Sequence, residues 1–342
     1  MTLITYPTRV HFADGVLEEA LYSELERASS AHPLLIFEST FLQSEFSERV
    51  QAGLPRPARS RLFSFARRRD LREAAVQASE LSPQTDAIVA FGSARAIELG
   101  RKCRHALSQI QRKRPELYVV PGADGLPNPC TRKVESWRAG LPSVLICDPT
   151  VTLDADNQLS RRTAVLSLIR CFEAYLANAY NPPADGMALD GLTRCVINLP
   201  KIGKLAGVDL HRELMAACLN AALSQEKGLG PSLTMSAALV HSNKDLDEAE
   251  IARLVLPGVI RLREVAPEKA DILRKVLGKQ DDDLDQAMGR VLSNLPMAPS
   301  LSDMGISRED LDAAAQAAAA TEGLDFGSAR SVLESIYDGG TR

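Results

Sequence analysis

The first half of the chain alternates short apolar runs with longer amphipathic stretches. Residues 14–30 carry apolar side chains at helical spacing, which predicts a helix that buries one face. Several apolar runs are too short for helices, do not alternate with polar residues and end at Pro, Gly or Asp, which is typical of buried parallel strands. These expected strands cover residues 34–37, 61–66, 87–91, 117–120 and 144–147. The pattern predicts a Rossmann-like α/β domain, which binds ligands at the carboxyl ends of its strands.

After about Asp154 the strand signal ends and amphipathic helices follow. Residues 160–180 and 209–225 have apolar positions at helical spacing, and Ala313–Thr321 is expected to be an alanine-rich helix. Stretches rich in Pro, Asn, Ser and Asp predict loops. These expected loops are residues 181–185, 242–247 and 295–299. We therefore expect two domains, an α/β nucleotide-binding-type domain at 1–154 and an all-α domain at 155–342.

The amino-acid composition is typical of an ordinary globular protein. The 342 residues are 45% hydrophobic and 25% charged, with a net charge of −4. The six cysteines form no CxxC pair, so we interpret them as small buried side chains in a reducing compartment. Met1–Tyr6 shows no basic segment followed by a long apolar run, and no uninterrupted apolar stretch approaches membrane-spanning length. We expect a cytoplasmic protein without membrane contact, acting as a homodimer.

Residues 55–72 concentrate seven arginines against one acidic residue, Asp70. Such a cluster can bind nucleic acid, but the acidic overall charge and the scarcity of interleaved aromatic residues argue against it. We expect no nucleic-acid partner. The predicted strand 61–66 ends toward the expected ligand-binding cleft at the carboxyl edge of the sheet. Arg67–Arg69 therefore either bind a small anion or form solvated surface, and solvated surface is favoured.

Short motifs in a fixed order connect this chain with a known family. The motifs are Val10–Gly15, Asp86–Ser93, Leu141–Thr152, Phe172–Tyr175, Gly228–Gly230, Leu256–Val259 and Leu301–Ser307. With an α/β half followed by a helical half, they resemble the iron-containing alcohol dehydrogenase family, and within it the maleylacetate reductases most nearly. The resemblance implies a dehydroquinate synthase-like architecture, with a dinucleotide bound in the first domain and a divalent metal in the second.

The residues at the family's metal-ligand positions do not suit a metal. Counted from the motifs, the resemblance places Leu166, Arg170, Leu233 and Glu248 there. A leucine offers no lone pair and a guanidinium repels a cation, so we expect no metal. The five histidines also include no pair three or four residues apart.

The cofactor motif differs from the family pattern as well. The family's loop of three glycines and a serine reads Ala90–Ser93 here, so Gly92 and Ser93 are the residues left for a phosphate contact. We expect Phe91 to obstruct the tightest point of this loop. A second loop supplies Gly125 as a further cofactor contact, but Asp124 brings negative charge toward the phosphate. NAD(P) binding is possible in principle and disfavoured by these residues.

Four residues are candidates for chemistry. Arg170 and Glu248 are expected either to form a structural ion pair in the vacated metal site or to act on a substrate, with Arg170 as the electrophile, and the structural pair is favoured. His241 is a candidate acid or base, although a surface position is favoured. Cys130 is a weak candidate nucleophile on the second loop.

Three function classes remain open. The first is a metal-independent NAD(P)-linked reductase of a small carbonyl acid, which the whole-chain resemblance favours. The second is a repurposed non-redox enzyme, such as a lyase, hydrolase or decarboxylase, acting on an anionic substrate in the interdomain cleft. The third is a catalytically inactive binding or scaffold protein, because a retained fold does not prove retained chemistry.

Overall fold

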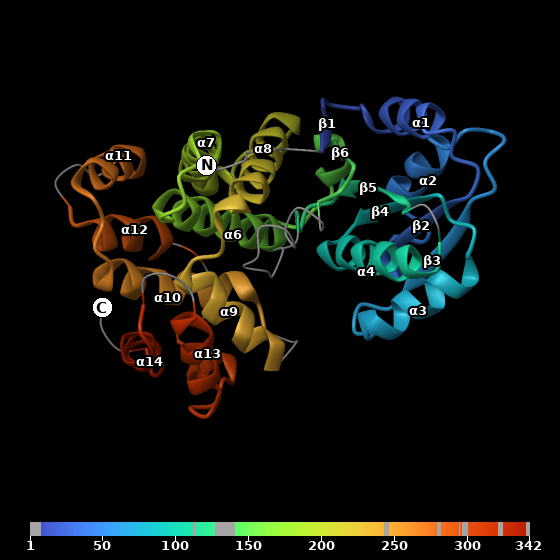
Figure 1. Cartoon of the computed structure of the whole chain (residues 1–342). Coiled ribbons are helices and arrows are strands. Elements are labelled where there is room, and N and C mark those ends of the chain that lie inside the picture. Colours follow the sequence, from blue (N-terminus) through green and yellow to red (C-terminus); the bar gives the residue numbers. More distant parts are fainter. Residues whose placement is uncertain are drawn as a thin grey trace.

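The molecule has a sheet-containing half and a helical half that lie side by side (Figure 1). The computed structural model describes residues 8–111, 114–126, 141–242, 246–278, 282–293, 295, 300–320 and 324–339. Within these ranges the sheet lies entirely in the first 147 residues. The later residues are helical apart from an isolated bridge between Ile202 and Leu205. The predicted order of an α/β half and an all-α half is confirmed.

Six parallel strands form one sheet in the order β1-β6-β5-β4-β2-β3. Each predicted strand is present, and β1, which the sequence pattern did not indicate, adds an edge. The strands are β1 Arg9–Phe12, β2 Pro33–Glu38, β3 Arg61–Phe65, β4 Ala87–Gly92, β5 Glu116–Pro121 and β6 Val144–Cys147.

Helices cover both faces of this sheet because its central strands are apolar on both sides. Leu35 and Val89 pack toward α1 and α2, whereas Leu34 and Ile88 pack toward α3 and α4. The elements of this half, besides the strands, are α1 Leu17–Arg27, η1 Ser39–Phe41, α2 Glu45–Ala52, α3 Leu71–Leu81, α4 Ala94–Ile110 and η2 Pro149–Thr152.

The helical half is built around α6, a 20-residue helix whose C-terminal two-thirds is buried. Two apolar clusters form its core, one around α6, α7 and α10 and one around α9, α13 and α14. The elements are α6 Asn157–Leu176, α7 Pro182–Asn198, η3 Leu199–Lys201, α8 Val208–Ser224, η4 Gln225–Lys227, α9 Pro231–Ser242, α10 Glu248–Leu262, α11 Pro267–Leu277, α12 Leu284–Ser293, η5 Ser302–Met304, α13 Asp310–Ala319 and α14 Phe326–Ser335.

One predicted loop is part of a helix. Residues 181–185 form the start of α7, where the Asn181 side chain accepts a hydrogen bond from the Ala184 N–H. Pro182 and Pro183 occupy the first helical positions, where proline costs no backbone hydrogen bond. Their presence after an Asn is therefore a helix-start signal. The loop expectations at 243–245 and 296–299 lie outside the described residues.

The two halves are joined along α6 and α8. Met215 and Cys218 of α8 belong to the apolar cluster on the α4 side of the sheet. Thr163 of α6 donates a hydrogen bond to the carbonyl oxygen of Ala123 at 2.7 Å. Arg212 of α8 pairs with Asp14, which precedes α1. Among the described helices, none combines the length and apolarity needed to cross a membrane.

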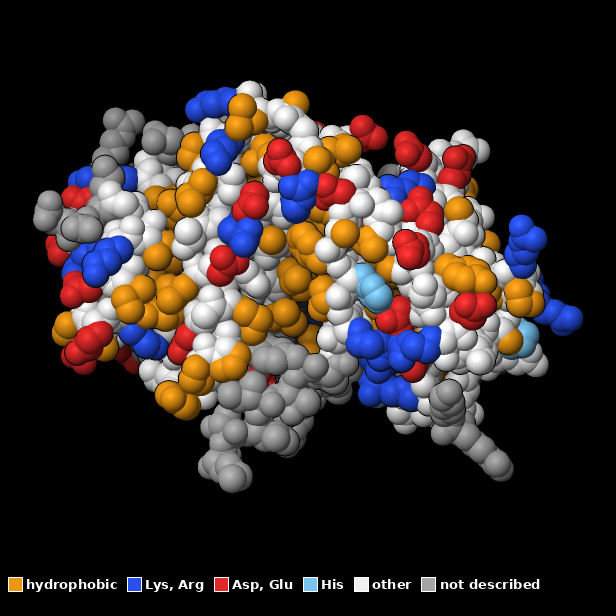
Figure 2. Space-filling model, turned by 90° about the horizontal axis from the view of Figure 1, so that it is seen from above, with side chains coloured by type: hydrophobic (Ala, Val, Ile, Leu, Met, Phe, Trp, Pro, Cys, Tyr) orange, Lys and Arg blue, Asp and Glu red, His pale blue; other side chains and the backbone are white. Residues whose placement is uncertain are grey.

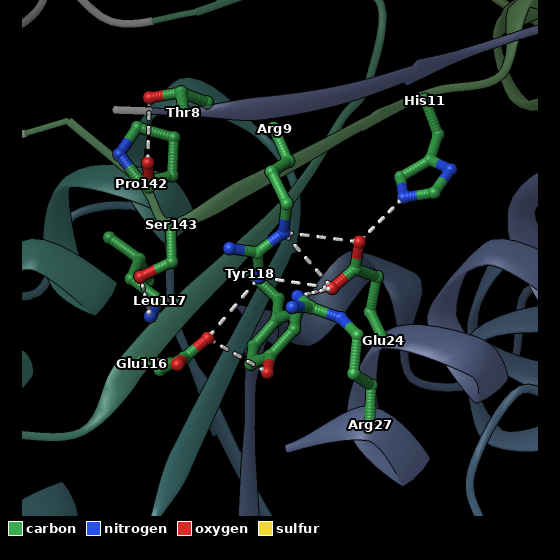
Figure 3. Close-up of polar contacts among 10 residues, drawn as sticks. All are labelled: Thr8, Arg9, His11, Glu24, Arg27, Glu116, Leu117, Tyr118, Pro142 and Ser143. Atoms are coloured by element: carbon green, nitrogen blue, oxygen red, sulfur yellow. Dashed lines mark hydrogen bonds and ion pairs between the residues drawn. The ribbon is translucent and has the colours of Figure 1, made fainter. Parts of the chain in front are cut away.

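A buried carboxylate ties β1 to α1 at the amino-terminal edge of the sheet (Figure 3). Glu24 is 5% exposed and accepts hydrogen bonds from Arg9 at 3.0 Å and from Arg27. His11 Nε2 lies 2.9 Å from the same carboxylate. Arg9 also pairs with Glu116 at 3.5 Å. Because ligands of such sheets bind at the opposite edge, we interpret this cluster as structural.

We expect Glu24→Gln to destabilise the protein at neutral pH. Burial raises the pKa of Glu24, but the hydrogen bonds from Arg9, His11 and Arg27 outweigh it and lower this pKa from its usual 4.5 to about 2. A depressed carboxyl pKa gives stability that is present above about 4.5 and lost as the pH falls toward 2, with an upper limit of about 3 kcal/mol. Urea unfolding at about pH 7 and about pH 3 should therefore show the difference between wild type and variant shrinking in acid. Exposed Glu19→Gln on the same helix is the control; an equal loss there would contradict the assignment.

Candidate functional site

A cavity opens between the two halves at the carboxyl edge of the sheet. The space between its walls, with open solvent included, amounts to about 460 Å³. The sheet half contributes the loop after β5, and the helical half contributes side chains of α6 and α8. Seen from above, hydrophobic side chains gather in the hollow of the molecule (Figure 2). Polar side chains in the wall include Thr152, Ser160, Thr163 and His211.

His211 is the histidine of this wall. Its Nδ1 lies 2.9 Å from the hydroxyl oxygen of Thr152. That hydroxyl donates to the carbonyl of Pro149 at 2.8 Å, so Nδ1 carries the proton and donates to Thr152. Burial lowers the pKa of His211. The neutral ring therefore presents Nε2 as its proton-accepting nitrogen.

Arg170 adjoins the same cavity from α6. It is 3% exposed and donates to the carbonyl of Leu126, which lines the cavity, at 2.6 Å. Its Nε has no hydrogen-bond partner, and no carboxylate of the described residues forms an ion pair with it. A buried guanidinium without a carboxylate partner among the described residues is energetically costly, which is typical of a functional position.

The other predicted catalytic residues are not gathered around Arg170. Glu248 begins α10 and is partly buried, and no ion pair joins it to Arg170 in the described parts of the chain. The ion pairs between α6 and α10 run instead through Arg162, which contacts Asp247 and Glu250. His241 is exposed at the end of α9. Cys130 lies outside the described residues.

Gly92 and Ser93 occupy the turn from β4 into α4. Gly92 has a φ of +86°, and a Cβ there would lie 2.9 Å from the Phe41 ring, so glycine is required. The Ser93 hydroxyl accepts from the Ala96 N–H at 3.1 Å and donates to the buried Glu38 carboxylate at 2.6 Å. The hydroxyl therefore has protein partners on both sides.

Asp124 lies directly at the N-terminus of α4. Its carboxylate accepts a hydrogen bond from the Ala94 N–H at 2.8 Å. Gly125, the third predicted cofactor contact, has a φ of +71° and would place a Cβ 2.5 Å from the Cys218 sulfur. The loop that carries these two residues therefore packs on both α4 and α8.

The expected obstruction by Phe91 is wrong. Its side chain is fully buried in the cluster between the sheet and α1 and α2, stacked on Phe37 at 4.8 Å between ring centroids. Successive side chains of a strand point to opposite faces, and this position faces away from α4. The Asp124 carboxylate, and not the Phe91 ring, lies at the N-terminus of α4.

The residues at the expected metal positions do not fit a divalent cation. Leu166 and Leu233 are hydrocarbon side chains, and Arg170 is a cation. Within the described ranges, no group of three or more His, Cys, Asp and Glu side chains could hold a metal ion. The residues at the N-terminus of α4 likewise do not fit a dinucleotide phosphate, because a carboxylate already accepts its first N–H.

Sequence reasoning missed His211, Thr152 and Glu38 as site residues. Thr152 and Glu38 follow or end strands at the carboxyl edge, and that placement is a signal that could have identified them. His211 carries no such signal, because its helix was predicted but the packing of that helix against the sheet was not.

Known proteins resemble this chain over its whole length. The profile described as Fe-containing alcohol dehydrogenase family, C-terminal, matches residues 161–332. A 4-hydroxybutyrate dehydrogenase of Cupriavidus necator is 27% identical over 354 residues, covering 91% of this chain and 92% of that protein. A maleylacetate reductase of Rhizobium sp. strain MTP-10005 is 25% identical over 351 residues, covering 98% of this chain and 97% of that protein.

A solved structure agrees in fold. The sulfoacetaldehyde reductase of Bifidobacterium kashiwanohense, in complex with NAD+, superimposes with a TM-score of 0.81 and covers 100% of both chains at 15% identity. This chain therefore shares the fold of that protein, and these matches agree with the resemblance that the motifs indicated.

Proposed function

Because this chain belongs to the Fe-containing alcohol dehydrogenase family, we propose that its cleft binds a small carbonyl acid through Arg170, without a divalent metal at the family's site. The observation that carries this proposal is the buried guanidinium without a carboxylate partner among the described residues. A carboxylate or developing oxyanion of the ligand would supply the missing negative charge. Among the named relatives, 4-hydroxybutyrate, maleylacetate and sulfoacetaldehyde are all anionic at neutral pH.

We propose a non-redox reaction for this site. Arg170 would hold the ligand's carboxylate or polarise its carbonyl oxygen, and His211 would accept a proton through Nε2. Support for a reaction without hydride transfer comes from the N-terminus of α4, where Asp124 stands in the place of a phosphate. Proton removal next to a carbonyl gives an enolate that Arg170 would stabilise, and protonated His211 would return the proton at another carbon. Loss of carbon dioxide from a 3-oxo acid leaves its electron pair in the same kind of enolate, which would take a proton from solvent.

A reductase is the second candidate, favoured by the names of the relatives. Both curated relatives described above are named for redox reactions, and they align with nearly the whole chain. In that case Arg170 would polarise the carbonyl that receives the hydride. The residues present at α4 do not fit the dinucleotide, which is why the non-redox reaction is preferred.

Calorimetric titration with small acids tests the proposed site. We expect 4-oxobutanoate and 4-hydroxybutyrate to bind, butane-1,4-diol not to bind, and a chelator to change neither result. Arg170→Met should weaken binding of the acids roughly ten- to hundredfold, because a charge-assisted hydrogen bond contributes about 1.5–3 kcal/mol. Its free energy of unfolding should stay equal or rise, since a buried charge is removed.

Arg161→Met is the matched control. Arg161 lies on the same helix and also donates to a backbone carbonyl, that of Ile202 at 3.0 Å, but Ile202, unlike Leu126, does not line the cavity. We expect this variant to bind the acids as wild type does. Equal binding by Arg170→Met, or a requirement for added metal, would remove Arg170 from the site.

A further inference from the structure

The N-terminus of α4 is the anion site that this fold offers, and in this chain it is used internally. A helix that begins at the carboxyl end of a parallel strand directs its first N–H groups at a phosphate. Here the Ala94 N–H donates to the Asp124 carboxylate at 2.8 Å, and the Ala96 N–H donates to the Ser93 hydroxyl at 3.1 Å. Both donors are therefore already satisfied by the protein.

The loop that carries Asp124 is held from both sides. The Gly122 N–H donates to the Gly92 carbonyl at 2.7 Å, and any Cβ at Gly122 would overlap that carbonyl. Thr163 donates to the Ala123 carbonyl, and the Leu126 N–H donates to the Cys218 sulfur at 3.2 Å. These contacts place the carboxylate at the helix end as part of the packed structure.

The charges around this helix end disfavour a further anion. Glu38 lies beside Ser93 with a hydrogen bond of 2.6 Å, so two carboxylates face the turn. Burial raises the pKa of Asp124 to about 6; Glu38 also raises this pKa, whereas the Ala94 N–H and Arg67 lower it. Asp124 is therefore mostly ionised at neutral pH and would repel a pyrophosphate.

We infer that Asp124 is an internal anion that closes the N-terminus of α4 to dinucleotide phosphates, and that its removal would open a phosphate site there. This inference does not depend on Arg170 or on the small acid proposed above. A solved structure with the same fold contains NAD+, whereas in this chain the Asp124 carboxylate occupies the N-terminus of α4. We attribute this difference in dinucleotide binding to Asp124.

Titration with NADH and with ADP-ribose, monitored by calorimetry at low ionic strength, tests the inference. We expect wild type to show no saturable binding at millimolar concentrations. Asp124→Gly, which removes the side chain, should bind both ligands at least tenfold more tightly than wild type. Asp124→Asn keeps the shape of the side chain and removes its charge, so its affinity for both ligands should lie between those of wild type and Asp124→Gly. This variant also tests the inference if the glycine variant does not fold.

The control is Asp325→Asn. Asp325 also caps a helix N-terminus, accepting from the Ser328 N–H at 3.0 Å, but it lies at α14. This variant should gain no NADH binding. Saturable NADH binding by wild type would overturn the inference, as would folded Asp124 variants that bind no more tightly. Titration of the same variants with 4-oxobutanoate shows whether the Arg170 site binds its acid. A failure of that site can then be told apart from a failure of the Asp124 inference.

Discussion

Replacing Phe91 with alanine is expected to lower the free energy of unfolding by about 3–5 kcal/mol, the typical cost of truncating a buried aromatic side chain. Phe91 is fully buried in the central strand β4. Its ring stacks on Phe37 at 4.8 Å and contacts Phe46 at 5.4 Å between centroids. The deletion leaves a cavity that neighbouring strands cannot fill, and it removes both aromatic contacts.

Urea unfolding measures this loss. Phe91→Leu is the matched control, because a large apolar side chain fills most of the same volume, and its cost should stay below that of alanine. We also expect neither variant to gain NADH binding, since the ring lies on the α1 and α2 side of the sheet. A loss below about 1 kcal/mol in the alanine variant would mean that the ring is not packed as described.

Replacing Glu173 with alanine is the second large effect, with an expected loss of about 3 kcal/mol. The Glu173 side chain is buried in the helical half and accepts hydrogen bonds from the Ser232 N–H at 2.8 Å and the Leu233 N–H at 3.2 Å. These are N–H groups in the first turn of α9, so the carboxylate caps that helix from α6. Alanine leaves both donors buried without an acceptor and opens a cavity.

Glu173→Gln separates hydrogen bonding from charge. Burial raises the pKa of Glu173, so the stability linked to this group is fully present at low pH and is lost as the pH rises through the folded-state pKa. Glutamine keeps an acceptor oxygen and never ionises. Unfolding measured from about pH 4 to about pH 8 should therefore show the glutamine variant gaining on wild type as the pH rises. A constant difference across this range would contradict the assigned burial of the charge.

The same contact explains two of the motifs that carry the family resemblance. Glu173 belongs to the Phe172–Tyr175 motif, and Gly230 ends the Gly228–Gly230 motif. A Cβ at Gly230 would overlap the Glu173 carboxyl group, so glycine is needed for the cap to form. These motifs therefore have a structural reason that is independent of a metal or a cofactor.

The sequence by itself determined the element types and their order. Short apolar runs such as 34–37 and 87–91 lie in buried strands, and the long amphipathic stretch 160–180 lies largely within one helix. These features follow from spacing along the chain, because the periods of strands and helices are local properties. The edge strand β1 escaped prediction because Arg9–Phe12 alternates charged, apolar and aromatic residues over only four positions.

Only the tertiary structure decided what each candidate site residue contacts. Arg170 was selected from a motif position, but its acceptor, Leu126, is 44 residues away in the chain. Asp124 meets the start of α4 across 30 residues, and His211 meets Thr152 across 59. Such pairings depend on which helix covers which face of the sheet. That arrangement is set by the packing of whole elements, and local spacing does not encode it.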